Sequence, residues 1–223
     1  MNNHRNRRLV AAVLAGVAMG FGAGACDGKD EAKKTDVSGA SISVSKVCGG
    51  IFDEESVSVV KSELGTEMVK KARAGESYSD HPAKAGRVLD GANGRGRVVS
   101  VCSFSGGDKS KDNLEITAEW GQAEFSDKRE LADPGMATDS VVFELEEEYP
   151  LISALYVACE RPDLFRAGEE QPALKFAVTD HISLNARTRA KILQNSAHRV
   201  LEALRCRNEV TFIKPPVTVP GLK

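Results

Sequence analysis

The positions of its five cysteines constrain this 223-residue chain more than any other feature of the sequence. One cysteine stands alone near the N-terminus, and the other four are spread over the rest of the chain. In an exported protein an even number of cysteines implies paired disulfides, and four cysteines allow three connectivities. The four are Cys48, Cys102, Cys159 and Cys206.

Residues 1–25 have the three zones of a secretory signal peptide. A basic start that includes Arg7 and Arg8 precedes an apolar run at 9–21 and small residues at 23–25. The apolar run is about half of the roughly 20 residues that a membrane-spanning helix needs. We therefore expect a cleaved signal, and the paired arginines leave open whether export follows the general or the twin-arginine route.

Cys26 directly follows the small residues Ala23, Gly24 and Ala25. This stretch resembles the lipobox of bacterial lipoproteins, although position 23 is alanine where a lipobox most often has leucine. The resemblance implies a diacylglycerol on the Cys26 thiol, and two acyl chains anchor a protein stably. We therefore expect a lipid-anchored protein on the outer face of the cytoplasmic membrane. The alternative is a secreted protein without lipid.

The segment that follows Cys26 has the composition of a tether. Residues 26–47 are polar, contain glycine and serine, and have few large apolar side chains, so they are predicted to form a flexible, lipid-anchored tether. Removal of residues 1–25 changes the net charge from −2 to −5, because they carry three arginines and no acidic residue. Such a chain lacks the clearly basic character of a nucleic-acid-binding protein.

Helix and strand patterns alternate over residues 48–214, and residues 215–223 are predicted to be an extended tail. Asp53 is a suitable N-cap for a helix over 54–64. An apolar stripe at helical spacing predicts the last helix at about 186–205. The polar stretch 74–96 is predicted to be a long connection. Alternating or apolar runs predict strands at 97–104, 114–120, 141–145, 151–160 and 173–179.

These patterns predict an α+β fold with a mainly antiparallel sheet and two principal helices packed on one face. Cys48 precedes the first helix and Cys102 lies on the next strand, whereas Cys159 lies on a later strand and Cys206 ends the last helix. We therefore predict the disulfides Cys48–Cys102 and Cys159–Cys206. The mirrored order of elements leaves open whether the domain consists of two similar halves.

Three short motifs carry a resemblance to a known group of proteins. They are Cys48-Gly49-Gly50 before the first helix, a mid-chain strand that ends in a cysteine, and Leu204-Arg205-Cys206 at the end of the last helix. Together they resemble actinobacterial cell-surface lipoproteins of unknown function. The resemblance implies a lipid-anchored, disulfide-stapled envelope domain and implies no reaction.

Motifs of hydrolytic enzymes are absent from the sequence. It contains neither Gly-x-Ser-x-Gly nor His-Glu-x-x-His. His81, His181 and His198 are isolated from one another, and the adjacent pair Asp180-His181 has no serine that the sequence places with it. We interpret these histidines as loop caps or surface residues, although a triad is assembled in space and needs no local motif.

One loop has oxygen ligands at the spacing of a calcium-binding EF-hand. Asp108, Ser110, Asp112 and Glu119 stand at positions 1, 3, 5 and 12 of such a loop. Asn113 occupies the position where glycine makes the sharp turn, and the following residues alternate as a strand. We therefore expect no metal site, and nothing in the sequence calls for another cofactor.

These observations favour a lipid-anchored extracytoplasmic envelope domain with a non-catalytic binding or accessory role. Its expected partners are the membrane, through a diacylglycerol on Cys26, and an unknown envelope protein or wall polymer. The acidic run at 144–148 and the basic face of the last helix are interpreted as solvated surfaces. Two alternatives remain open: an envelope hydrolase whose site is assembled from distant residues, and a structural or assembly partner of another envelope protein.

Overall fold

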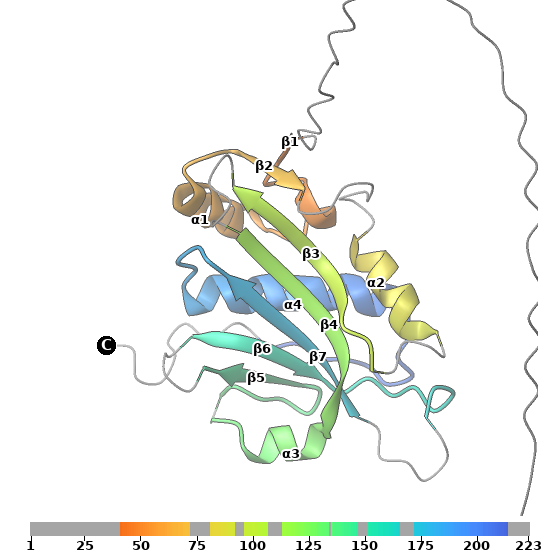
Figure 1. Cartoon of the computed structure of the whole chain (residues 1–223). Helices are drawn as coiled ribbons and strands as arrows, with labels where there is room; N and C mark the ends of the chain where they lie inside the picture. Colours follow the sequence, from red (N-terminus) through yellow and green to blue (C-terminus); the bar gives the residue numbers. More distant parts are fainter. Residues whose placement is uncertain are drawn as a thin grey trace, which may run out of the picture. The chain divides into compact units, whose positions relative to one another are not determined.

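The computed structural model describes residues 41–71, 81–91, 96–106, 113–133, 135–146, 151–165 and 172–213 (Figure 1). The predicted signal peptide, Cys26, the first part of the predicted tether and the predicted tail at 215–223 lie outside the described residues. The residues considered below all belong to one unit, Ser38–Lys223.

The described part of the chain forms one seven-stranded sheet in the order β1-β2-β3-β4-β7-β6-β5. Every pair of neighbouring strands is antiparallel. The long central pair β4 and β7 brings the first and second halves of the chain together. The strands are β1 (Ser41–Ser43), β2 (Met68–Lys71), β3 (Val99–Gly106), β4 (Asn113–Glu124), β5 (Val141–Leu145), β6 (Ile152–Val157) and β7 (Pro172–Asp180).

The helices lie on both faces of the sheet but cover them unequally. The long helix α4 crosses behind the strands, with α1 and α2 packed against it (Figure 1). The short helix α3 follows β4 and lies against the other face, near β5 and β6. The helices are α1 (Glu54–Leu64), α2 (His81–Asp90), α3 (Phe125–Glu130) and α4 (Ala186–Leu204), with a short 3-10 helix η1 (Val47–Gly49) before α1. The predicted α+β class is thus confirmed.

The two helices predicted from the sequence are present as α1 and α4, and each begins after a residue whose side chain caps its N-terminus. The Asp53 carboxylate accepts a hydrogen bond of 2.7 Å from the Ser56 amide, and α1 ends at Gly65 in the left-handed region (φ 64°). In α4, the Asn185 side chain accepts a bond of 2.9 Å from the Thr188 amide. The stripe of α4 facing the sheet is fully buried and consists of Ala190, Leu193, Ala197, Val200 and Leu204.

Helix α2 lies within the polar stretch that was predicted to be a connection, so that prediction was wrong. The helix contacts α4 through Gly86, where a Cβ atom would lie only 2.5 Å from the Val200 carbonyl oxygen and 2.7 Å from Ala203 Cβ. The buried face of α2 is short, consisting of Pro82, Ala85 and Leu89 beside Gly86, so its apolar signal is weak within a segment that is otherwise polar. The indole of Trp120 donates a 3.2 Å bond to the Leu89 carbonyl near the end of this helix.

The folded domain begins before the predicted boundary at residue 48. Residues 41–47, which the sequence places in the tether, contain β1 and the start of η1. Ile42 lies opposite Val69 of β2, and Val44 and Val47 are fully buried. Serine and lysine between these apolar residues gave the segment a tether-like composition, whereas pairing with β2 buries its few large side chains.

Both predicted disulfides are confirmed. Cys48 bonds to Cys102 with their Cα atoms 5.3 Å apart, and Cys159 bonds to Cys206 with their Cα atoms 5.0 Å apart. The sequence analysis placed Cys159 on a strand, but in the structure it lies just after the end of β6. Paired disulfides of this kind indicate that the domain folds in an oxidising, extracytoplasmic compartment.

A buried arginine holds the helix ends together beside the second disulfide. The Arg161 side chain is only 8% exposed, and its guanidinium donates to the Asp90 carboxylate and to the Leu204 carbonyl. It also makes a fork of two bonds, 3.0 and 2.7 Å, to the carboxylate of Asp163. Arg161 therefore links the ends of α2 and α4, which are far apart in sequence.

Replacing this arginine tests its role. We expect Arg161→Met to lower the free energy of unfolding by about 2 to 4 kcal/mol, because it leaves a helix-end carbonyl and a partly buried carboxylate without their donor. Urea unfolding monitored by circular dichroism measures the change. The matched control is Arg129→Met, whose ion pair with Asp139 is exposed and whose effect is expected within about 0.5 kcal/mol. Equal effects of the two substitutions would contradict this role.

Candidate functional site

The cations of α4, which the sequence presents as a basic face, are paired within the domain. Lys191 bonds to Asp53 at 3.2 Å and to Glu55 at 2.5 Å, and Arg187 also reaches Glu55 at 3.2 Å. Arg199 lies 3.6 Å from Glu202, one turn further along the helix. The pairs of Lys191 and Arg187 join α4 to the start of α1, whereas the Arg199–Glu202 pair lies within α4. Together they leave the helix little net positive charge for binding an anionic surface.

The fourth cation of this helix, Arg189, belongs to the interior. Its side chain is 8% exposed and contacts the carboxylate of Asp180, 2% exposed, at 3.0 Å. It also donates to Glu146 at 2.9 Å. Burial raises the pKa of Asp180 above its ordinary value, although the charge of Arg189 opposes that shift.

The structure places Asp180, His181 and Ser183 around one hollow of about 430 Å³. These three residue types can form a hydrolytic triad, but the Asp180 carboxylate faces Arg189. His181 is exposed, and its backbone amide donates to the Asn113 carbonyl at 3.0 Å. The three residues are close together, yet the hydrogen bonds of the described residues do not connect them as a triad would require.

The other two histidines of the domain lie in different places. His81 is buried at the first turn of α2. His198 lies on α4, where its ring stacks on Phe212 with the ring centroids 3.9 Å apart. The structure therefore does not bring the three histidines together, and in the part of the chain that it describes no group of acidic, histidine or cysteine side chains is arranged to hold a metal ion.

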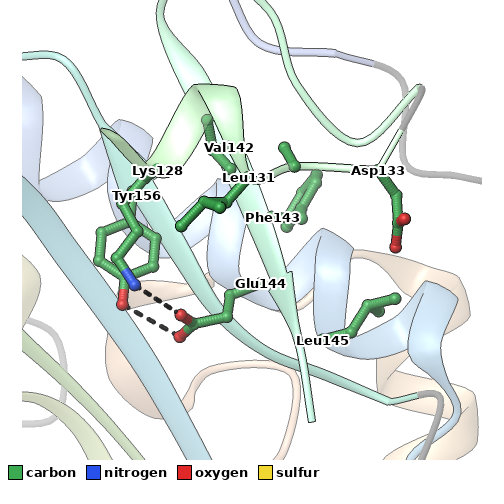
Figure 2. Close-up of a pocket in the computed structure, with 9 residues that line it drawn as sticks. Lys128, Leu131, Asp133, Val142, Phe143, Glu144, Leu145 and Tyr156 are labelled. Atoms are coloured by element: carbon green, nitrogen blue, oxygen red, sulfur yellow. Dashed lines mark hydrogen bonds and ion pairs between the residues drawn. The ribbon is translucent and has the colours of Figure 1, made fainter. Parts of the chain in front are cut away.

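A smaller hollow of about 230 Å³ lies between α3 and β5, and we call it the α3–β5 hollow (Figure 2). Strand β5 is the last strand of the sheet, and the segment after α3 runs beside it. The hollow is lined by Lys128, Leu131, Ala132, Asp133, Val142, Phe143, Glu144, Leu145 and Tyr156.

The lining residues place this hollow at the outer edge of the sheet. Residues 142–145 are consecutive on β5, and successive side chains of a strand point to opposite faces. A hollow that touches all four follows β5 along its length, and β5 is the outermost strand of the sheet. Val142 and Tyr156 belong to a small apolar cluster on the face that α3 covers, whereas Val141 and Phe143 belong to the main core on the α4 face.

Glu144 is the polar centre of the hollow. One carboxylate oxygen accepts a 2.8 Å bond from Lys128 Nζ, and the other accepts a 3.0 Å bond from the Tyr156 hydroxyl (Figure 2). Lys128 Nζ also lies 4.5 Å from the centre of the Tyr156 ring. The elements α3, β5 and β6 each contribute one of these three side chains.

The two charges at this centre are both stabilised. Burial disfavours the charged form of Glu144, but the hydrogen bonds from Lys128 and Tyr156 outweigh it and hold the pKa of Glu144 below its ordinary value of 4.5. The bond to Glu144 raises the pKa of Lys128, against the effect of burial. Both groups are therefore ionised at neutral pH, and the remaining lone pairs of the carboxylate can accept a further donor.

Leu131 gives the rim of the hollow an apolar character. It is 84% exposed, the largest exposed fraction among the large hydrophobic side chains of the described residues. It stands beside Val142, which is buried beneath it. An apolar wall next to an ion pair and an unpaired edge can bind a group that is partly apolar and partly charged, but it offers no nucleophile set against a base.

Sequence reasoning missed this site. Glu144 was assigned to an acidic run interpreted as a solvated turn, and Lys128, Leu131 and Tyr156 were not singled out. The three polar groups are separated by 16 and 12 residues. Only the pairing of β5 with β6 and the packing of α3 bring them together, so no local spacing signals the site.

The chain matches no known protein-family model, and no curated protein or solved structure is detectably similar to it. Among the described residues, no helix has the length and apolar character needed to cross a membrane. The site must therefore be interpreted from its own geometry.

The low pKa of Glu144 predicts an acid-sensitive stability. Because this pKa is lower in the folded than in the unfolded chain, the ion pair stabilises the fold above pH 4.5 and loses that effect as the pH falls through the folded-state pKa. Urea unfolding of wild type and Glu144→Gln, from about pH 7 to about pH 3, is expected to show a difference that shrinks on acidification.

A second variant checks the cause of that pH dependence. Lys128→Met removes the main donor to Glu144 and is expected to flatten the same acidic slope. A difference between wild type and Glu144→Gln that stays constant over the whole pH range would contradict the ion-pair assignment.

Proposed function

We propose that this protein is a lipid-anchored domain of the bacterial envelope that binds a partner outside the membrane, without catalysing a reaction, and that it belongs with the actinobacterial cell-surface lipoproteins that its cysteine motifs resemble. Cys26 carries a diacylglycerol in this proposal, and the domain lies at the outer face of the cytoplasmic membrane. The partner is another envelope component that binds in the α3–β5 hollow.

Two features support the envelope location. The disulfides at both ends of the fold require an oxidising compartment, and the N-terminal sequence has the zones of an export signal followed by Cys26. A protein anchored in this way faces other envelope components, which makes a binding or accessory role the simplest use of a small domain.

The observation that carries the binding role is the exposed Leu131 above the Lys128–Glu144 ion pair. Leu131 is 84% exposed and lies on the rim of the hollow, so it can give a partner apolar contact, and the Glu144 carboxylate beside it can still accept a hydrogen bond. The larger hollow at Asp180 is lined by the Arg189–Asp180 ion pair, whose two charges already compensate each other.

The anchor is tested on the native protein. Mass spectrometry of the N-terminal peptide from intact cells is expected to show Cys26 as the first residue, with a diacylglycerol mass on it. Cys26→Ser is expected to abolish processing at this position and the lipid mass. A mature chain with a free, unmodified Cys26 would contradict the anchor.

The binding surface is tested by site-specific crosslinking in intact cells. A photoreactive benzoylphenylalanine at Leu131 is expected to form a discrete covalent adduct, because this position lies on the rim of the hollow. The matched control is the same group at Val98, which is also exposed (63%) but lies outside the hollow. Adducts of the same size and yield at both positions, or at neither, would contradict the proposed surface.

A further inference from the structure

The outer edge of β5 is only half covered. Residues just before the strand form an isolated bridge to it, in which Ala137 lies opposite Val142. The Thr138 amide donates to the Val141 carbonyl at 2.8 Å, and the Phe143 amide donates to the Met136 carbonyl at 2.9 Å. The first half of the edge is therefore already paired, and the last pairing bond that the described residues make along it is the one from the Phe143 amide.

The second half of the edge carries backbone groups that point away from the sheet. Leu145 lies opposite Ile152, and the Glu146 amide donates to the Leu151 carbonyl at 2.8 Å. This pattern makes Leu145 and Ile152 a non-hydrogen-bonded pair, whose amide and carbonyl groups face away from each other. The Leu145 N–H and C=O thus point outward, away from β6.

The α3–β5 hollow lies directly beside these open groups. Its volume of about 230 Å³ is below the roughly 300–1,000 Å³ of pockets for drug-sized ligands and is suited to a single side chain. Residues 142–145 line it from the same strand whose backbone is open. An edge that offers strand-like hydrogen bonds and an adjacent side-chain pocket is the arrangement used in recognition by strand addition.

The charges around this edge favour a basic occupant. Two carboxylates, Asp133 and Glu144, line the hollow against one cation, Lys128. No cation of the described residues pairs with Asp133. Glu146, the residue after Leu145, is already paired with Arg189 and adds no free charge. A lysine or arginine of the bound segment would therefore find its partner in the Asp133 carboxylate, with Glu144 able to accept a further hydrogen bond.

We propose that an extended, basic peptide segment of a partner protein adds as a short strand to the open half of β5 and places one apolar side chain in the α3–β5 hollow. This inference rests on the proposed function and specifies its partner. The segment pairs with the outward groups of Leu145, its apolar side chain contacts Leu131 and Val142, and its basic residues face Glu144 and Asp133.

Two other occupants fit less well. A second copy of this chain, pairing β5 with β5, would bring Lys128 to the edge already paired with Glu144 and would supply no free cation for Asp133. A wall polysaccharide would need an exposed aromatic face for stacking, but Tyr156, the aromatic side chain beside Glu144, is only 4% exposed. Only a peptide backbone matches donors and acceptors that are spaced as in a strand.

The test uses two synthetic probes and the purified full-length chain in detergent. The basic probe is acetyl-Lys-Val-Lys-Leu-Lys-Val-amide, and the acidic control has glutamate in place of each lysine. Fluorescence anisotropy at low ionic strength is expected to show the basic probe binding at least about tenfold more tightly. Hydrogen exchange is expected to show slower exchange of the Leu145 amide when the basic probe is bound.

Matched variants separate the backbone from the side chain. Leu145→Pro removes the outward N–H without removing a bond to β6, and proline is tolerated at such edge positions. It is expected to weaken binding at least about tenfold, whereas Leu145→Ala keeps the N–H and is expected to weaken it less than about threefold. Leu131→Ser changes only an exposed side chain, so the fold is kept, and it is also expected to weaken binding about tenfold.

The outcomes distinguish this inference from the proposed function. No binding of the basic probe at about 1 mM, equal binding of the acidic probe, or unchanged binding after both Leu145→Pro and Leu131→Ser would overturn the strand-addition model. A discrete crosslink at Leu131 in cells would then still support a partner at the hollow, bound by other chemistry. If the basic probe binds specifically but no crosslink forms at Leu131 in cells, the proposed partner site in the cell would be wrong. Binding of a strand to β5 would then still be supported in vitro.

Discussion

The burial of α4 against one face of the sheet is the constraint on which the rest of this structure depends. Its apolar stripe fills the main core, α1 packs against it, and α2 lies against both α4 and strand β3. Arg161 and the Cys159–Cys206 disulfide fix its C-terminal end, and the ion pairs of Lys191 fix its middle to the start of α1. These contacts make α4 a structural element that holds the helix layer to the sheet.

The unequal covering of the two faces decides where a partner can bind. Three helices cover one face, whereas α3 covers only the end of the other face near β5 and β6. This places an ion pair, an exposed leucine and a half-open strand edge at one corner of the sheet. Edge strands are normally protected by charge or by short length. At β5 the charged side chains lie beside a hollow that is large enough for one side chain. The same charges that disfavour non-specific strand pairing can therefore favour one particular peptide.

Much of the fold was predictable because its signals are local. The N-cap Asp53, the apolar stripe of α4 and the alternation in β4 each lie within one segment, and the cysteine placement relative to these elements led to the observed disulfides. Helix α2 was missed because its buried face is short and includes Gly86, within a segment that is otherwise polar. Residues 41–47 were assigned to the tether because a short edge strand differs from a linker only through its partner, β2.

The candidate site could not be predicted in the same way. Patterns within single segments predicted the Asp53 cap, the two principal helices and five of the seven strands, and the placement of the cysteines on these elements favoured the pairing that forms. The meeting of Glu144 with Lys128 and Tyr156, the inward turn of Arg189 to Asp180 and the outward direction of the Leu145 backbone groups became visible in the folded domain alone. Those outcomes depend on strand order and on which face each helix covers, and neither is written in the spacing of any one segment.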